Sequence, residues 1–161
     1  MFTIGDSIFI KAPIERCFLL STNVEFVGRT YRMKPIEGKT KGLVEADDKL
    51  LWAGWKFGMP QMHESVISQY EKPNFFQDTM TRGRFKRYQH DHYFYEMDAR
   101  TVVNDKIRFT MPLGPLGRLV GRLVLVPYLS RRLRRRLVLL RKVAENRKEW
   151  QKYLPEEKVS L

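Results

Sequence analysis

The last long segment of the chain, residues 116–154, constrains the fold more than any other feature. Its apolar residues recur at the spacing of one face of an α-helix, at Leu116, Leu119, Leu123, Leu129, Leu133, Leu137, Leu140 and Val143. Pro127 lies inside this run and lacks a backbone N–H, so we expect a kink there, with a short helix before it and a longer one after it. An amphipathic helix of this length needs a broad apolar surface to cover. The rest of the chain must supply that surface as a sheet.

The residues before this segment have the patterns of strands and short helices. Alternation of apolar and polar residues predicts a first strand from about Phe2 to Ile10, and Pro13 suits the first turn of a helix that ends near Thr22. A second short helical piece is expected at Val24–Gly28. Turn residues then separate extended segments at Tyr31–Glu37, Val44–Phe57, Gln61–Glu71, Phe75–Phe85, Tyr88–Met97 and Thr101–Thr110. The predicted fold is α+β, a curved antiparallel sheet of about seven strands wrapped around the C-terminal helix, with two short helices after the first strand. A cavity is expected between sheet and helix.

Length and composition set the class of protein. With 161 residues, 43% of them hydrophobic, the chain is expected to form one domain over residues 1–154, followed by a short tail at 155–161. The opening residues do not resemble a signal peptide, and no apolar run approaches the roughly 20 residues that span a bilayer. Cys17 is the only cysteine, so no internal disulfide can form. These features predict a cytoplasmic protein.

The net charge of +12 is concentrated in the C-terminal helix. Residues 116–154 contain 12 basic and 2 acidic residues, and the densest part holds Arg131, Arg132, Arg134, Arg135 and Arg136. Such a face can attract anionic lipid, at about 1 kcal/mol per basic residue near the surface, which would place the protein at the inner face of the membrane. The alternative is a helix face that is simply solvated. Nucleic acid is a less favoured partner because the basic segment lacks interleaved aromatic residues and a known binding motif.

The last two strands have a register that their side chains specify. A turn at Asp98-Ala99 predicts pairing in which residue numbers sum to 197. The solvent face then pairs Asp91 with Lys106 and Gln89 with Arg108, and the inner face pairs Phe94 with Val103, His90 with Ile107 and His92 with Asp105. A slip by one residue would turn basic residues inward. We therefore expect His90, His92 and Asp105 to share a mostly apolar inner face.

This polar trio allows four interpretations, of which one is contact with a bound ligand without chemistry. Two histidines and a carboxylate on neighbouring strands can bind a metal. They can also form an acid–base pair, in which Asp105 fixes the tautomer of His92. The simplest interpretation, which we favour, is a hydrogen-bonded polar cluster that satisfies buried groups. His63 lies on another strand and is a further candidate for the same cavity, and no cofactor is predicted.

Motifs around these residues resemble a known family. The runs are Gly83-Arg84-Phe85-x-x-Tyr88-x-His90-x-His92-x-Phe94, Thr101-x-x-x-Asp105-x-Ile107-x-Phe109-x-x-Pro112-x-Gly114-x-x-Gly117, Phe57-Gly58-Met59-Pro60 and Pro73-x-x-Phe76-x-Asp78. Together they resemble the SRPBCC group of the START-like superfamily, especially its polyketide cyclase/dehydrase-like and coenzyme Q-binding-like members. The resemblance implies a helix-grip fold around a hydrophobic cavity. It also implies binding of lipids, quinones, polyketides or other apolar molecules, with enzymes a minority. It carries over no shared catalytic residue.

Three functions follow as expectations. The first is binding of a hydrophobic or aromatic small molecule without catalysis, in a cavity lined by Trp52, Trp55, Met62, His63, Tyr88, His90, His92, Phe94, Val103, Asp105, Ile107, Phe109, Leu119, Leu123 and Leu133. The second is a cyclase or dehydratase that uses His92 as base and Asp105 as its orienting partner. The third is peripheral association with an anionic membrane through the basic helix, for delivery of a lipid or quinone. The oligomeric state is not predicted.

Overall fold

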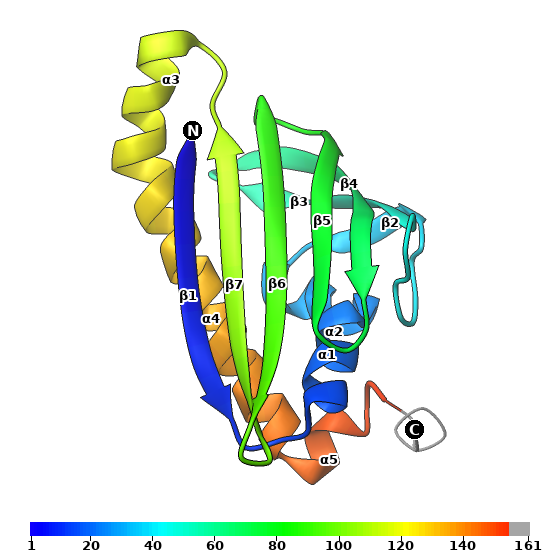
Figure 1. Cartoon of the computed structure of the whole chain (residues 1–161). Helices are drawn as coiled ribbons and strands as arrows, with labels where there is room; N and C mark the ends of the chain where they lie inside the picture. Colours follow the sequence, from blue (N-terminus) through cyan, green and yellow to red (C-terminus); the bar gives the residue numbers. More distant parts are fainter. Residues whose placement is uncertain (155–161) are drawn as a thin grey trace.

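A seven-stranded antiparallel sheet curves around one long C-terminal helix in the computed structural model, which describes residues 1–154 (Figure 1). The predicted tail at 155–161 lies outside the described residues. The strand order across the sheet is β1-β7-β6-β5-β4-β3-β2. The strands are β1 (Phe2–Ile10), β2 (Lys34–Gly38), β3 (Lys49–Lys56), β4 (Met59–Glu71), β5 (Phe75–Arg82), β6 (Arg87–Met97) and β7 (Arg100–Thr110). The helices are α1 (Ile14–Thr22), α2 (Val24–Tyr31), α3 (Gly114–Val120), the π-helical turn η1 (Gly121–Leu125), α4 (Val126–Glu145) and α5 (Arg147–Trp150).

The predicted α+β helix-grip architecture is confirmed, including the two short helices after the first strand. Consecutive strands from β2 to β7 pair with their neighbours, and β1 closes the other edge by pairing with β7. Helix α4 lies across the concave face, and α1 and α2 cover the end of the sheet near the β4–β5 turn (Figure 1). The described part of the chain holds no helix long and apolar enough to cross a membrane.

The predicted register of β6 and β7 is confirmed. His92 pairs with Asp105, and His90 pairs with Ile107. One detail of the solvent face was wrong, because Asp91 is fully buried there. Its carboxylate accepts hydrogen bonds from Arg108 and, at 2.9 Å each, from two glutamines of neighbouring positions, Gln77 and Gln89. These longer side chains cover the carboxylate.

The C-terminal helix differs from the prediction in its continuity. The expected interruption near Pro127 takes the form of η1, where the Val126 N–H donates to the Gly121 carbonyl and the wide turn precedes the proline. A second break was not predicted. Helix α4 ends at Glu145, and the side chain of Asn146 accepts from the N–H of Lys148 at 3.0 Å to start α5.

Three other element boundaries differ from the prediction: the strand expected to end at Phe85 ends at Arg82, and the other two differences have local reasons. The segment predicted as a strand from Tyr31 instead continues α2 to that residue, and Arg32 ends the helix in the left-handed conformation. The strand predicted from Val44 begins only at Lys49. Asp47 has a φ of 65°, and the Asp48 carboxylate accepts from the Glu45 N–H at 2.9 Å, so a turn occupies this stretch.

The core has two parts that flank the middle of α4. Phe18 of α1 is fully buried and meets the rings of Tyr70, Phe76 and Phe94 edge-on, at centroid distances of 5.3–5.6 Å. The second, smaller part packs β1 and β7 against α4 through Ile4, Ile107, Phe109, Leu129 and Leu133. Residues of both parts line a space between sheet and helix.

Candidate functional site: a cavity between the sheet and the helix

The space between the concave sheet and helices α2 and α4 is a cavity of about 500 Å³. Most of its wall is apolar. Its main apolar residues are Val24, Val27, Met33, Leu50, Trp52, Ile67, Phe76, Phe85, Ile107, Met111, Leu129 and Leu133. This volume and composition are those of sites that bury most of the surface of a small organic molecule.

The structure sorts the predicted lining residues into three groups. On the wall lie Trp52, Met62, His63, Tyr88, His92, Ile107 and Leu133. Buried in the structure, but not on the wall, are His90, Phe94, Val103, Asp105 and Phe109. Exposed and away from the wall are Trp55, Leu119 and Leu123.

The exposed group is explained by the periodicity of its elements. Trp55 is 71% exposed because alternate residues of β3 point to opposite faces, and Trp52 and Lys56 occupy the inner one. Along α3 and η1, Val120 and Val124 face the cavity, so Leu119 and Leu123 turn outward. The start of α3 also projects past the N-terminal end of β1, where no strand lies beneath it (Figure 1).

Asp105 is the centre of a buried polar network. Arg136 donates to its Oδ2 oxygen, and Nδ1 of His92 lies 2.9 Å from its Oδ1 oxygen. Nε2 of His90 lies 3.6 Å from Oδ2. Across the rings, Oδ2 of Asp78 lies 3.3 Å from Nε2 of His92 and 3.8 Å from Nδ1 of His90. The two histidines are therefore held between two carboxylates, of which Asp78 lies on the cavity wall.

The ionisation of this network follows from burial and charge. Burial would raise the pKa of Asp105, but Arg136 and His92 beside it hold that pKa well below its ordinary value. Burial also acts to raise the pKa of Asp78, which the two histidines nevertheless lower. Burial and the neighbouring His92 lower the pKa of His90 to about 4. At neutral pH both carboxylates are charged and His90 is neutral.

The residues that could face a metal differ from the predicted trio. Ligand atoms of Asp78, His90 and His92 lie within 4.8 Å of one another, whereas Asp105 contacts the opposite ring nitrogens and Arg136. The charge of the cavity favours an anion over a cation. Among the described residues, four basic side chains line it and one carboxylate does, the basic ones being Lys56, Arg84, Arg132 and Arg136.

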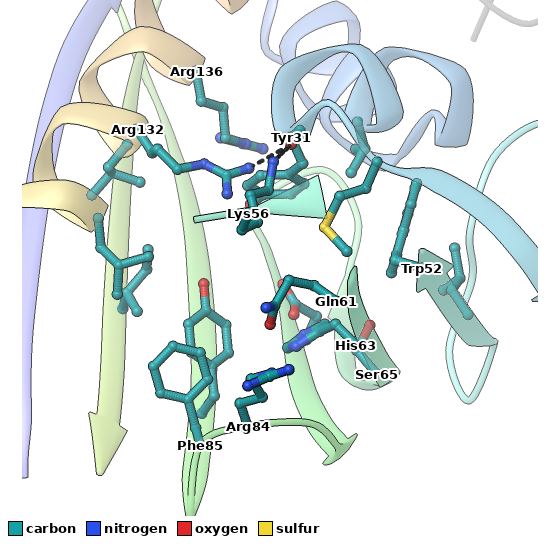
Figure 2. Close-up of a pocket in the computed structure, with 18 of the residues that line it drawn as sticks. Tyr31, Trp52, Lys56, Gln61, His63, Ser65, Arg84, Phe85, Arg132 and Arg136 are labelled. Atoms are coloured by element: carbon teal, nitrogen blue, oxygen red, sulfur yellow. Dashed lines mark hydrogen bonds between the residues drawn. The ribbon is translucent and has the colours of Figure 1, made fainter. Parts of the chain in front are cut away.

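Three of these basic side chains converge at one end of the cavity, beside Tyr31 (Figure 2). Lys56 Nζ and Arg132 donate to the same carbonyl oxygen of Tyr31, at 2.6 and 2.8 Å. Two cationic nitrogens on one acceptor are at most about 5.4 Å apart, and at an effective dielectric constant of about 20 they repel by about 3 kcal/mol. This repulsion offsets much of what the two hydrogen bonds contribute, about 1.5–3 kcal/mol each. Arg84 enters the cavity from the opposite end, next to Phe85 (Figure 2).

Sequence reasoning missed several wall residues, although two of them left a signal. Arg136 falls inside the apolar stripe of α4, between Leu133 and Leu137, which places it on the inner face. Lys56 shares the inner face of β3 with Trp52. Asp78 belongs to one of the family-like motifs, but no local signal placed it beside the histidines, because its approach to them depends on the pairing of β5 with β6.

The basic face of α4 is smaller than predicted. Arg136 is 2% exposed and is paired with Asp105, and Arg132 lies on the cavity wall. Both therefore turn inward, since the helical stripe that covers the sheet includes their positions. The exposed members of the predicted set are Arg131, Arg134 and Arg135, of which Arg134 lies 3.5 Å from Asp6 of β1.

Comparison with known proteins places this geometry among solved folds. No protein-family model matches the chain, and no match was found among curated proteins. The protein TTHA0849 from Thermus thermophilus superimposes with a TM-score of 0.71 over 88% of this chain and 95% of its own, at 16% sequence identity. The di-domain ARO/CYC BexL from the BE-7585A biosynthetic pathway gives a TM-score of 0.72 at 15% identity, over 91% of this chain and 50% of its own.

A second di-domain ARO/CYC, StfQ from the steffimycin biosynthetic pathway, agrees with this result. Its TM-score is 0.70 at 14% identity, over 91% of this chain and 51% of its own, so the chain spans about half of each two-domain protein. At such low identity the likeness concerns the fold. The chain has an α+β helix-grip fold, as its sequence motifs predicted, and these solved structures share that fold.

Proposed function

We propose that the protein binds a hydrophobic or aromatic small molecule, of the lipid, quinone or polyketide kind, in the cavity between the sheet and α4. The observation that carries this proposal is a mostly apolar cavity of about 500 Å³ in the middle of the fold. Burying apolar ligand surface there contributes about 25 cal/mol per Å². The ARO/CYC proteins with the same fold belong, by their names, to biosynthetic pathways, which supports a small organic ligand.

The proposal is tested by native mass spectrometry of the protein purified from its own host, followed by organic extraction. We expect an apolar molecule bound in equal stoichiometry. Ser65→Phe fills the cavity, since Ser65 is buried on its wall (Figure 2), and should lose the bound molecule. Ser68→Phe is the matched control, because Ser68 lies exposed on the same strand and away from the cavity. Equal ligand content in both folded variants would contradict the proposal.

A second candidate is acid–base catalysis on the bound molecule, as in a cyclase or dehydratase. It is favoured by one observation, the contact of His92 on the cavity wall with Asp105 at 2.9 Å, which can orient the ring. Replacing His92 by alanine separates the two functions. A pure binding protein should lose modest affinity for the extracted molecule, whereas an enzyme that uses His92 as base should lose roughly 10²–10⁴ in turnover of it.

We also propose that the cavity contacts an anionic membrane when the ligand is collected, at the end where the lining residues Phe57, Met59 and Val124 are exposed. Apolar side chains are exposed around this end and on the adjacent helix, at Phe57, Met59, Met62, Leu116, Leu119, Val120, Leu123 and Val124. We call this set the apolar rim. Arg118 and Arg122 are exposed within the same helical segment and match the charge of anionic lipid.

The membrane contact is tested by sedimentation with vesicles of phosphatidylcholine, with and without phosphatidylserine. Leu119→Asp/Leu123→Asp should abolish binding to the anionic vesicles, because two carboxylates would oppose both insertion and charge attraction. Arg131→Gln/Arg135→Gln should reduce binding only weakly, since these residues lie outside the rim. Loss of binding only in Arg131→Gln/Arg135→Gln would show that the basic face of α4, and not the apolar rim, contacts the membrane. Equal binding to neutral and anionic vesicles would contradict the proposed attraction to anionic lipid.

A further inference from the structure

We infer that the ligand of the cavity is an apolar carboxylic acid, whose carboxylate binds between Arg136, Arg132 and Lys56 while its body occupies the apolar part of the wall. This inference rests on the proposed binding function and names the chemical class of the ligand. It depends on three features of the cationic end of the cavity: an incompletely paired buried guanidinium, two cations without a carboxylate partner, and an excess of positive charge.

The guanidinium of Arg136 is incompletely satisfied. The side chain is 2% exposed and lies on the cavity wall, and its NH1 group donates to Asp105. Its Nε and NH2 groups have no hydrogen-bond partner within residues 1–154. A buried charged donor without a partner is costly, and native proteins rarely leave one. A guanidinium presents its N–H groups as a planar fork that matches the two oxygens of a carboxylate.

Arg132 and Lys56 are held beside Arg136 without a counter-charge. Both donate to the carbonyl oxygen of Tyr31, and no carboxylate of the described chain lies within 4.0 Å of either. The Arg132 guanidinium stacks over the rings of Tyr31 and Tyr128, at 5.1 and 5.6 Å, which fixes its plane. Lys56 uses one of three N–H donors for the carbonyl, so two remain for a ligand.

The simpler explanation is that these cations cap the C-terminal end of α2. That explanation accounts for the contacts with the Tyr31 carbonyl. It leaves the free nitrogens of Arg136 unexplained, and it does not require three cations to converge on the cavity side of the helix end (Figure 2). Burial and the charges of Arg132 and Arg32 also lower the pKa of Lys56 to about 8, an effect that a bound anion reverses. A bound carboxylate would account for the unpaired nitrogens of Arg136, for the convergence of three cations and for the lowered pKa of Lys56.

The rest of the cavity wall indicates the chemical character of the remainder of the ligand. Away from the cationic end, the cavity is bounded by aromatic and aliphatic side chains such as Trp52, Phe76, Phe85 and Leu129. A free inorganic anion would leave this surface without contacts, and a neutral hydrocarbon would leave the guanidinium unpaired. An acid with an apolar body is complementary to both parts.

The test uses two fluorescent probes of equal shape, pyrenebutyric acid and pyrenebutanol, titrated into the full chain at pH 7. A charge-assisted hydrogen bond contributes about 1.5–3 kcal/mol, so we expect the acid to bind roughly 10- to 100-fold more tightly than the alcohol. Equal affinities, or tighter binding of the alcohol, would overturn the inference and leave the proposed function standing. Failure of both probes to bind would count against the proposed function itself.

Variants of Lys56 and Arg132 test whether these two cations cause the tighter binding of the acid. Lys56→Met and Arg132→Met should each lower acid affinity about tenfold or more and change alcohol affinity less than about threefold. The matched controls, Lys49→Met on the same strand and Arg135→Met on the same helix, remove an equal charge at exposed positions off the wall. Loss of acid binding in the controls as well would show that only the overall charge matters and would refute the assignment.

Arg136 requires a milder substitution, because its removal leaves Asp105 buried without its partner. Arg136→Lys keeps the positive charge beside Asp105 but removes the two nitrogens that lack a hydrogen-bond partner. It should lower acid affinity about tenfold while alcohol affinity stays unchanged. An unchanged acid preference in this folded variant would exclude Arg136 from the site.

Discussion

The ion pair between Asp105 and Arg136 gives the sharpest prediction about stability. Both side chains are at most 2% exposed, so removing one partner leaves the other as an uncompensated buried charge. Such a change costs about 3–5 kcal/mol, out of a total of about 5–15 kcal/mol for a domain. Asp105→Asn and Arg136→Met should each lower the free energy of unfolding by this amount. The double variant should cost well below the sum of the two, because it leaves no lone charge.

Urea denaturation at pH 7, followed by circular dichroism, measures this double-mutant cycle. We expect a coupling energy of about 2–3 kcal/mol, near the upper end of values for contacting residues. The control cycle uses Asp6 and Arg134, whose side chains are 31% and 54% exposed and lie 3.5 Å apart. Its coupling should stay below about 1 kcal/mol. Additive losses in the buried cycle would refute the view that the network is organised around this pair.

Three further predictions concern acid, backbone space and ligand detection. Because the pKa of His90 falls from 6.5 to about 4 on folding, the unfolded chain binds the extra proton between these values, and stability should fall by up to about 3 kcal/mol as pH drops through that window. Urea titrations at pH 7 and 4.5 should show a smaller loss in His90→Gln. In Gly117→Ala the new methyl would lie 1.7 Å from the Pro112 carbonyl oxygen, so thermal unfolding should show a clearly lower Tm, by about 2–4 °C per kcal/mol; an unchanged Tm would contradict the close approach. Pyrenebutyric acid should quench emission from Trp52 on the cavity wall, so Trp52→Phe should remove that response and Trp55→Phe should keep it.

Much of the architecture could be predicted from local patterns. Alternation along the strands identified which side chains of β6 and β7 face inward, and only one register kept the basic residues out, so the pairing of His92 with Asp105 followed from the sequence. The buried face of α4 was also predicted correctly from its apolar stripe, since Leu133, Leu137 and Leu140 are all buried. Local hydrogen bonds that override periodicity, such as the cap at Asn146, could not be predicted from these patterns.

Which residues line the cavity depends on how the elements pack against one another. A periodicity of two or 3.6 residues tells which face a side chain occupies, and not which other element faces it. Asp78 reaches His92 only because β5 lies beside β6, and Lys56 reaches Arg132 only because the sheet curves until β3 and α4 meet at the end of α2. Periodicity along the chain therefore specifies the helix-grip fold and the inward face of the polar hairpin. The cationic end of the cavity exists because curvature brings together residues that are far apart in the chain.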